Sequence, residues 1–315
     1  MRVLIPFTVG EEVTPPIPAQ GYIESTNIPE NDFAQWAVGT TYAVGDKVIS
    51  TTTHRIYEAL QVSTGVDPTT DTADPPYWLN LAATNRWKAF DQKISDPVTV
   101  PDGTTTINYV LKGFGIPSNS LTLFGLIGRK ASLIVTDATD GEVYNRDISL
   151  VDNTLVDDWF TYFFEPARVK SEAIFEGIPP YANAEYDITV TDTTSVEPQL
   201  GQIVVGQEYT LGNTNYGTSV SIEDYSRKDR DAFGNAIIVQ RPFAKLIDFD
   251  FTINTSSARR TAILLEDMRA TPAVYYAGID TEQFGTTVYG FFRNFSINLD
   301  GPAISNVTLE VEGLT

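Results

Sequence analysis

The chain has 315 residues, 42% of them hydrophobic, and its 21 basic and 41 acidic residues give a formal net charge of −20 at pH 7. This length and apolar content predict a fully folded chain of roughly two or three domains. The negative charge excludes nucleic acid as the expected partner, because phosphate binding requires a positive field. The chain has no cysteine, which excludes disulfides, thiolate nucleophiles and cysteine-based zinc sites.

Residues 1–29 begin with a strand pattern, "RVLIPFTV", followed by the proline-rich arm "TPPIPAQG". The apolar run is too short for a signal peptide, and no run of about 18 apolar residues could span a membrane. We therefore expect synthesis in the cytoplasm and no membrane insertion. Successive residues of a strand point to opposite faces, and here the residues on both faces are apolar. Because the prolines also separate this strand from later strands, we expect it to pair with a neighbouring subunit or another protein.

Residues 30–82 form a small unit rich in aromatic residues. The order and approximate spacing "W…Y..GD.V…Y.A…P…W" is carried by Trp36, Tyr42, Gly45, Asp46, Val48, Tyr57, Ala59 and Trp78. The Gly45-Asp46 pair predicts a hairpin-type turn, and large aromatics can build the core of so small a domain. The pattern resembles the chitin-binding modules of carbohydrate-binding families 5 and 12, which are three-stranded domains of about this length.

The resemblance implies that aromatic faces of this module stack on the apolar C–H faces of sugar rings. The candidate contacts are Trp36, Tyr57, Tyr77 and Trp78. Tyr77 is the best of them, because Pro75 and Pro76 hold it on a stiff, exposed loop. Trp36 and Trp78 are alternatively the core of the module.

The chain departs from those modules at one informative place. They commonly carry adjacent aromatics just after "Y.A", whereas this chain has Gln61 and Val62 there. The expected affinity for a glycan is therefore weak, in the millimolar range per site, and becomes useful only when several copies act on one surface. Two interpretations stay open: a weak glycan-binding module and a purely structural spacer.

The rest of the chain is dominated by strand patterns. Segments such as "TTINYVLKG", "ASLIVTD" and "EYDITVTD" alternate with period two and end in Gly, Asp or Asn. They predict an antiparallel β-sandwich of jelly-roll type over residues 83–198, with a short amphipathic turn at 159–164. Residues 199–315 form a second β-rich region that we expect to be a scaffold for docking.

One helix is predicted over residues 256–270, "SSARRTAILLEDMRA", where a serine can cap the start and Pro272 stops the end. The simplest interpretation is that it covers one face of a sheet. A second interpretation adds an interface, in which Arg259 and Arg260 meet an acidic neighbouring protein while the helix carries local pairs with its own acids.

The wider chain carries a second resemblance. The phrases "ATNRWKAFD", "DWFTYFFEP", "GIPPYANAEYDITV" and "VYGFFRNFSINLDG" are similar to segments of tail and baseplate structural proteins of tailed bacteriophages, from Trp78 onward. The resemblance implies a virion protein of the phage tail, made in the host cytoplasm. It implies a symmetric homo-oligomer that contacts other tail or baseplate proteins and a host cell-surface glycan during host attachment, with no cofactor.

Catalytic patterns are weak in this sequence. The single histidine, His54, lies between two predicted strands, where an exposed hairpin residue is favoured over a Ser-His-Asp triad. A glycosidase requires two converging carboxylates, and Asp157 and Asp158 before Trp159 are the best pair. Solvated turn acids are the favoured interpretation of that pair.

Metal sites and charge runs are equally weak. Asp67, Asp71 and Asp74 offer oxygen ligands suited to Ca²⁺, but Asp, Pro and Thr are ordinary turn residues and we expect no metal. The mixed-charge run over 226–235, "SRKDRDAFGN", predicts an exposed hairpin, with inter-subunit salt bridges as the alternative.

Two functions of different class remain. The first is a structural, non-enzymatic component of a phage tail or baseplate that presents the module at 30–82. The alternative is a virion-borne or secreted polysaccharide-degrading enzyme that uses the module for targeting. The lack of a compact catalytic pattern favours the first.

Overall fold

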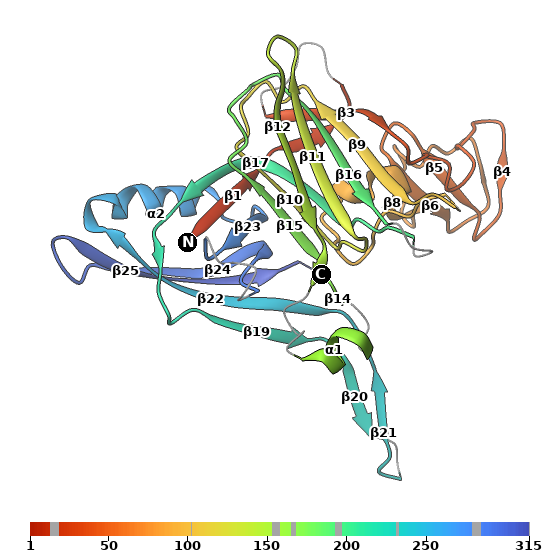
Figure 1. Cartoon of the computed structure of the whole chain (residues 1–315). Helices are drawn as coiled ribbons and strands as arrows, with labels where there is room; N and C mark the ends of the chain where they lie inside the picture. Colours follow the sequence, from red (N-terminus) through yellow and green to blue (C-terminus); the bar gives the residue numbers. More distant parts are fainter. Residues whose placement is uncertain are drawn as a thin grey trace.

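The computed structural model confirms a mainly β protein with a small three-stranded module, a sandwich of two sheets, and a second β-rich region with a helix (Figure 1). It describes residues 1–12, 19–101, 103–152, 158–164, 168–192, 197–230, 233–278 and 285–314. No helix within these ranges is long and apolar enough to cross a membrane.

The largest sheet has ten strands among the described residues. Its order is β15 (Glu172–Glu176), β10 (Ser120–Phe124), β17 (Gln202–Thr210), β1 (Arg2–Pro6), β23 (Ala273–Tyr276), β24 (Val288–Asn298), β25 (Ile304–Gly313), β22 (Phe243–Asn254) and β18 (Asn213–Thr214), with β19 (Ser219–Asp224) also paired to β22. All of its pairings are antiparallel. The sheet therefore joins segments from the first, third and fourth sequence regions.

A second sheet has six strands within the described ranges. Its order is β12 (Gly141–Ser149), β11 (Lys130–Asp137), β16 (Glu185–Thr191), β9 (Thr106–Lys112), β3 (Gln20–Thr26) and β2 (Thr8–Gly10). The pairing of β2 with β3 is parallel and the other pairings are antiparallel.

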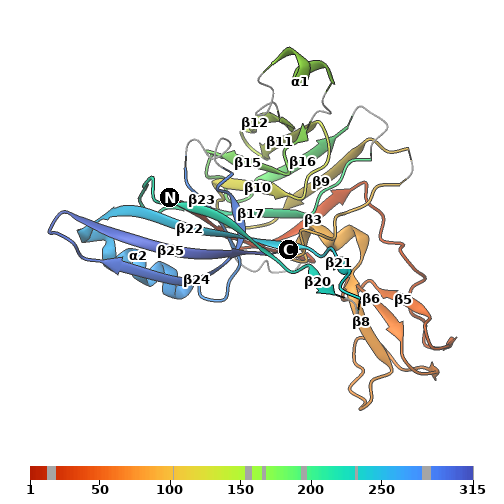
Figure 2. The same cartoon turned by 90° about the horizontal axis from the view of Figure 1, so that it is seen from below.

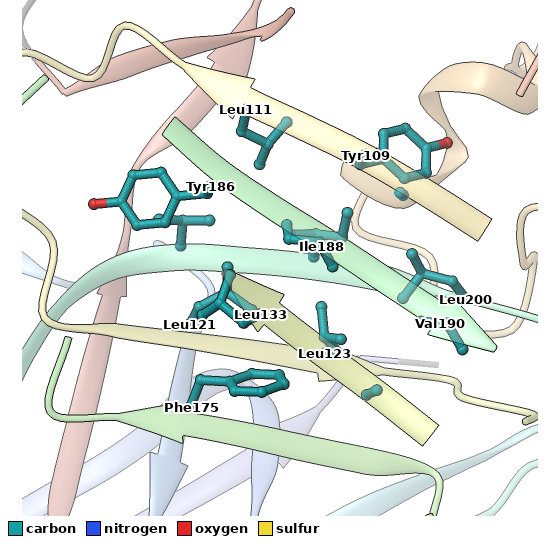
Figure 3. Close-up of a cluster of buried hydrophobic side chains, with 14 of the residues drawn as sticks. Tyr109, Leu111, Leu121, Leu123, Leu133, Phe175, Tyr186, Ile188, Val190 and Leu200 are labelled. Carbon is teal, nitrogen blue, oxygen red and sulfur yellow. The ribbon is translucent and has the colours of Figure 1, made fainter. Parts of the chain in front are cut away.

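The six-stranded sheet packs face to face on the β15-β10-β17 end of the larger sheet. Alternate residues of β9 and β16 point inward, and Figure 3 shows Leu111, Tyr186 and Ile188 facing Leu121 and Phe175. Each of these five side chains is at most 1% exposed. This period-two burial is the sandwich that the alternating patterns predicted, although β10, β15 and β17 continue into a sheet that extends well beyond it.

A second core lies on the other half of the large sheet. The single-turn η2 (Thr255–Ser257) leads into the predicted helix, α2 (Ala258–Asp267), which buries Leu265 and the following Met268 against Ile247, Phe249 and Phe251. The prediction that this helix covers one face of a sheet is confirmed. The helix ends three residues before the expected limit.

The leading strand is placed differently from the expectation. β1 pairs with β17 on one side and with β23 on the other, so it lies inside the ten-stranded sheet of its own chain. The prediction that it pairs with a neighbouring subunit or another protein is therefore wrong. The apolar residues on both alternations are explained instead by burial on both faces of the sheet, since Val3 and Leu4 are both 0% exposed.

The remaining elements are short. They are β4 (Thr41–Tyr42) with β7 (Ser63–Thr64), β5 (Lys47–Ser50) with β6 (Arg55–Ala59) and β8 (Trp78–Ala83), the 3-10 helix η1 (Asn85–Phe90), β13 (Val151–Asp152) with β14 (Arg168–Val169), α1 (Trp159–Phe164), and β20 (Arg227–Arg230) with β21 (Ala236–Val239). The β20-β21 hairpin confirms the exposed hairpin expected at 226–235; residues 231 and 232 lie outside the description.

We predict that Leu4→Ala lowers the free energy of unfolding by about 2–5 kcal/mol, because it leaves a cavity in an interior strand. The urea midpoint monitored by circular dichroism measures this effect. Leu299→Ala is the control, since that side chain is 69% exposed and its truncation should change stability little. Equal midpoints for the two variants would show that β1 does not belong to the cooperative core.

Candidate functional site

The aromatic unit at 30–82 folds as a distinct module beside the sandwich (Figures 1 and 2). Its antiparallel sheet has the order β5-β6-β8, with Val48 opposite Tyr57 and Ala59 opposite Trp78. The edge of β5 is covered by the segment before it, because Trp36 N–H donates to Ile49 O at 3.0 Å.

The Gly45-Asp46 turn does not close a hairpin between paired strands. It connects β4 with β5, which pair with different strands, β7 and β6. Gly45 has a φ of +92°, a left-handed conformation that favours glycine. The Asp46 carboxylate accepts a hydrogen bond from Ala43 N–H at 2.7 Å, which fixes the turn.

Two of the four predicted sugar contacts form the core of the module. Tyr57 is 7% and Trp78 5% exposed, and they pack with Tyr42, Val48 and Ala59. The indole N–H of Trp78 donates to Val66 O at 2.9 Å, and its ring meets Tyr42 edge to face at a centroid distance of 5.2 Å. Neither Tyr57 nor Trp78 offers an open ring face to a sugar in this arrangement.

The other two predicted contacts are partly exposed. Trp36 and Tyr77 pack against the edge of the same core and are intermediate in burial. Tyr77 directly precedes β8, and its carbonyl accepts the N–H of Leu60 at 2.8 Å. The structure therefore brings Tyr77 beside the chain that leaves β6.

Two exposed apolar residues, Leu60 and Val62, lie on the chain that leaves β6 next to Tyr77, and we call Leu60, Val62 and Tyr77 the Tyr77 surface. Leu60 is 39% and Val62 64% exposed. Gln61, the residue that departs from the module pattern, donates from Nε2 to the carbonyls of Pro75 and Pro76 at 3.1 and 3.2 Å. Its side chain thus fastens the proline loop to the end of β6. Sequence reasoning did not include Leu60, whose contact with Tyr77 depends on the pairing of β6 and β8.

The carboxylates of Asp67 and Asp71 accept hydrogen bonds from backbone N–H groups of their own loop. Asp71 accepts N–H groups of Ala73, Tyr77 and Trp78 at 3.1, 2.7 and 3.0 Å. Desolvation opposes the effect, but these three hydrogen bonds lower the pKa of Asp71. Asp67 accepts the N–H and hydroxyl of Thr69, both at 2.8 Å. No cluster of three His, Cys, Asp or Glu suited to a metal occurs in the described part of the chain.

His54 lies in the turn of the β5-β6 hairpin, as expected, but its side chain is only 16% exposed and lies at the joint between the module and the sandwich. Its Nδ1 is 2.9 Å from Glu30 Oε1, and its ring stacks on Trp87 at a centroid distance of 4.1 Å. The Thr84 hydroxyl donates to the same Glu30 oxygen at 2.9 Å rather than to the imidazole. His54 Nε2 lies 3.0 Å from Glu11 Oε1 without hydrogen-bond alignment. The contacts fit a structural link and do not activate a hydroxyl nucleophile.

A cleft of about 570 Å³ opens beside this joint. Four glutamates line it together with Arg86: the adjacent Glu11 and Glu12, Glu24 on β3, and Glu30. Desolvation, followed by the negative charges of Glu24 and Glu12, raises the pKa of Tyr22 in the same cleft. No local sequence pattern could have indicated this cleft, since its acids are gathered from positions 11 to 30 by the pairing of β2 with β3.

The predicted carboxylate pair is only half described. Asp157 lies outside the described residues, and Asp158 is exposed next to α1. Four aromatic side chains of α1 are also exposed, with Trp159 at 78%, Phe160 at 64%, Phe163 at 66% and Phe164 at 74%. The short turn predicted at 159–164 is confirmed as a helix.

The interface candidates Arg259 and Arg260 are exposed on α2. Within the described residues, no ion pair joins either arginine to the acids Glu266 and Asp267 that follow on the helix. The expected local pairs therefore do not form there, and both guanidinium groups remain on the outer side of the helix. Their contact with a neighbouring protein stays a prediction.

No known protein family, curated protein or solved structure matches this chain. Its function must therefore be inferred from the geometry of its own residues.

We predict opposite effects for two adjacent residues of the module. Trp78→Ala should destabilise the module by about 3–5 kcal/mol, because it removes a large buried ring. Tyr77→Ala should leave the melting temperature nearly unchanged, because the ring lies at the edge of the core. Thermal unfolding together with limited proteolysis of the 30–82 segment measures both. Similar protease resistance of the two variants would contradict the assignment of Trp78 to the core.

The Asp71 hydrogen bonds predict a pH dependence of the Tyr77 loop. Because the pKa of Asp71 is lowered below its ordinary value of 3.8, its contribution to loop stability is present above that value and lost as the pH falls through the folded pKa. The amide proton resonances of Tyr77 and Trp78 should shift together in acid, with a midpoint below 3.8. Asp71→Asn should abolish this transition, and Asp74→Asn is the control that should retain it.

Proposed function

We propose that this chain is a structural component of a bacteriophage tail or baseplate that presents the module at 30–82 as a weak glycan-binding unit for host attachment. The observation that carries the glycan-binding part is the separation of roles within the module. Tyr57 and Trp78 stabilise its core, while Tyr77 stays at the surface on a loop held by Asp71 and Gln61.

The Tyr77 surface has the chemistry of a small sugar platform. Tyr77 is partly exposed, its carbonyl accepts the N–H of Leu60, and Leu60 and Val62 are exposed on the adjoining chain. An aromatic ring in such a setting can stack on the C–H face of a sugar ring, and its phenol hydroxyl can add a polar contact. Holding the ring before binding reduces the entropy lost on association. A single ring per copy supports weak binding, so useful retention requires several copies on one particle.

The body of the chain supports a structural role. Two packed sheets and the large sheet that extends from them make a rigid β scaffold, with the module on one side of it (Figures 1 and 2). The scaffold also carries exposed apolar side chains far from the module, such as Ile222, Ile238 and Phe243. Such residues are typical of surfaces that become buried in an assembly. We therefore propose a homo-oligomer that also contacts other tail or baseplate proteins in the virion.

Glycan retention by the chain displayed in many copies on beads tests this proposal. We expect beads carrying the native chain to retain chitin fragments or a bacterial surface polysaccharide. Tyr77→Ala should lower this retention roughly tenfold, because removing a stacked ring costs about 1–3 kcal/mol of binding free energy. Val38→Ala is the matched control, since Val38 is 68% exposed in the same module and lies outside the Tyr77 surface.

Equal retention of the Tyr77→Ala and Val38→Ala beads would contradict the assignment of the Tyr77 surface. No retention of any glycan by the multivalent native chain would leave the module as a spacer. Release of reducing ends from the same glycans would instead support the alternative, a polysaccharide-degrading enzyme.

A further inference from the structure

A long two-stranded arm extends from the large sheet. β19 pairs with β22 up to Asp224 opposite Phe243, and the same two segments continue as β20 and β21, from Arg227 opposite Val239. Figure 1 shows this continuation leaving the sheet at the bottom of the view, away from the module. Within the described residues no third strand pairs with β20 or β21. A two-stranded ribbon has little stability of its own in water, so the open edges of the arm are available for pairing with a further strand.

The two strands of the arm differ in their side chains. β20 carries charge along its whole length, a common protection of an open edge, whereas β21 reads Ala-Ile-Ile-Val. Ile237, Ile238 and Val239 are 49%, 68% and 46% exposed. Because successive residues of a strand point to opposite faces, β21 is apolar on both faces and also has an open backbone edge. These are the properties of a strand that becomes an inner strand of another sheet.

The arm is basic on an acidic protein. Residues 226–241 hold four basic and two acidic residues, a net charge of +2, while the whole chain carries −20. The register places Lys228 and Arg230 on the same face as Ile238. Lys228 Nζ lies 2.6 Å from Asp224 Oδ2 in an exposed pair, and no ion pair is formed by Arg230 among the described residues. The face combines positive charge with an exposed apolar side chain, so its complementary surface is acidic with apolar elements.

The acidic cleft beside His54 fits this face. Two other cavities among the described residues differ from this cleft. In the cavity at Arg2, the acids Glu176 and Glu208 are already paired with that arginine, and the cavity near Tyr216 contains no acid. Of the three, the cleft beside His54 therefore has the clearly negative lining. The cleft also adjoins an open strand edge. β2 covers β3 up to Tyr22, and beyond that point no strand among the described residues pairs with Ile23–Thr26 on that side.

We propose that the β20-β21 arm of one copy docks in the acidic cleft of a second copy of this chain. The four residues of β21 match the four uncovered residues of β3 in length, and Lys228 and Arg230 meet Glu12 and Glu24, both exposed at the mouth of the cleft. Strand addition supplies backbone hydrogen bonds, and the charges set the register.

The arm of a copy does not reach its own cleft. The arm, β20 and β21, lies at the bottom of Figure 1, whereas β3 and the module, whose residues line the cleft, lie at the upper right. The contact therefore joins two different surfaces in a head-to-tail manner, which builds a ring if the rotation closes and a filament if it does not. This inference rests on one part of the proposed function, the formation of a homo-oligomer. It does not depend on glycan binding.

Two charge-reversed variants test the proposal. Lys228→Glu with Arg230→Glu gives an acidic arm, and Glu12→Lys with Glu24→Lys gives a basic cleft. Each variant alone places like charges at the contact, so its self-association measured by analytical ultracentrifugation should weaken roughly tenfold or more. In an equal mixture every arm meets a cleft of opposite charge, and association should return to the native level.

Arg129→Glu with Lys130→Glu is the matched control, since it reverses two exposed basic residues at the start of β11, outside the arm and the cleft, and should associate like the native chain. Circular dichroism melting verifies that all variants are folded. The proposal is overturned if the native chain stays monomeric at every concentration, if the reversed variants associate normally, or if the mixture fails to recover. Recovery of association by mixing with unchanged glycan retention on beads separates this proposal from the glycan-binding one.

Discussion

The architecture depends on the pairing of β1 with both β17 and β23. On one side β17 belongs to the sandwich, and on the other β23 leads into the half of the sheet that α2 covers. The contact with β17 is close: a Cβ at Gly206 would lie 1.9 Å from Ile5 O, so glycine is required where the two backbones meet. A segment of five residues at the beginning of the chain thus joins the two cores into one continuous sheet.

A charge network reinforces this joint. Arg2 Nη1 lies 2.9 Å from Glu176 Oε2 and 3.0 Å from Glu208 Oε1, and the Tyr276 hydroxyl donates to the other oxygen of Glu208. Burial and the negative charge of Glu208 raise the pKa of Tyr276, so this hydroxyl remains a donor. The network links β1 with β15, β17 and β23. Since the side chains of Arg2 and Glu208 are largely buried, removing one partner would leave the other charge poorly solvated.

The sequence predicted the local secondary structure better than it predicted which strands pair with each other. Period-two patterns indicated the strands, and helical spacing in 256–270 indicated α2, because both depend on residues close in the chain. The pairing of β1 depended on strands more than 200 residues away, and its doubly apolar pattern fitted an intermolecular edge as well as an interior strand. In the module, the resemblance carried by the aromatics implied three strands, but the choice between a sugar contact and a core residue for Trp78 required the register of β8 on β6. The acidic cleft gathers residues that share no motif.

The charge distribution connects the scaffold with the arm. A strong negative charge spread over most of the chain keeps copies apart in solution and opposes nonspecific contact between the apolar patches of the scaffold. The arm carries the opposite sign next to an apolar strand, so attraction is confined to one element and to surfaces that are both acidic and open to a strand. An assembly built through such arms would repeat the module at fixed spacing, and repetition is what a platform with a single half-buried tyrosine requires to hold a surface. The weak glycan affinity that we propose for the module would then suffice, because retention would arise from the number of copies rather than from the strength of each contact.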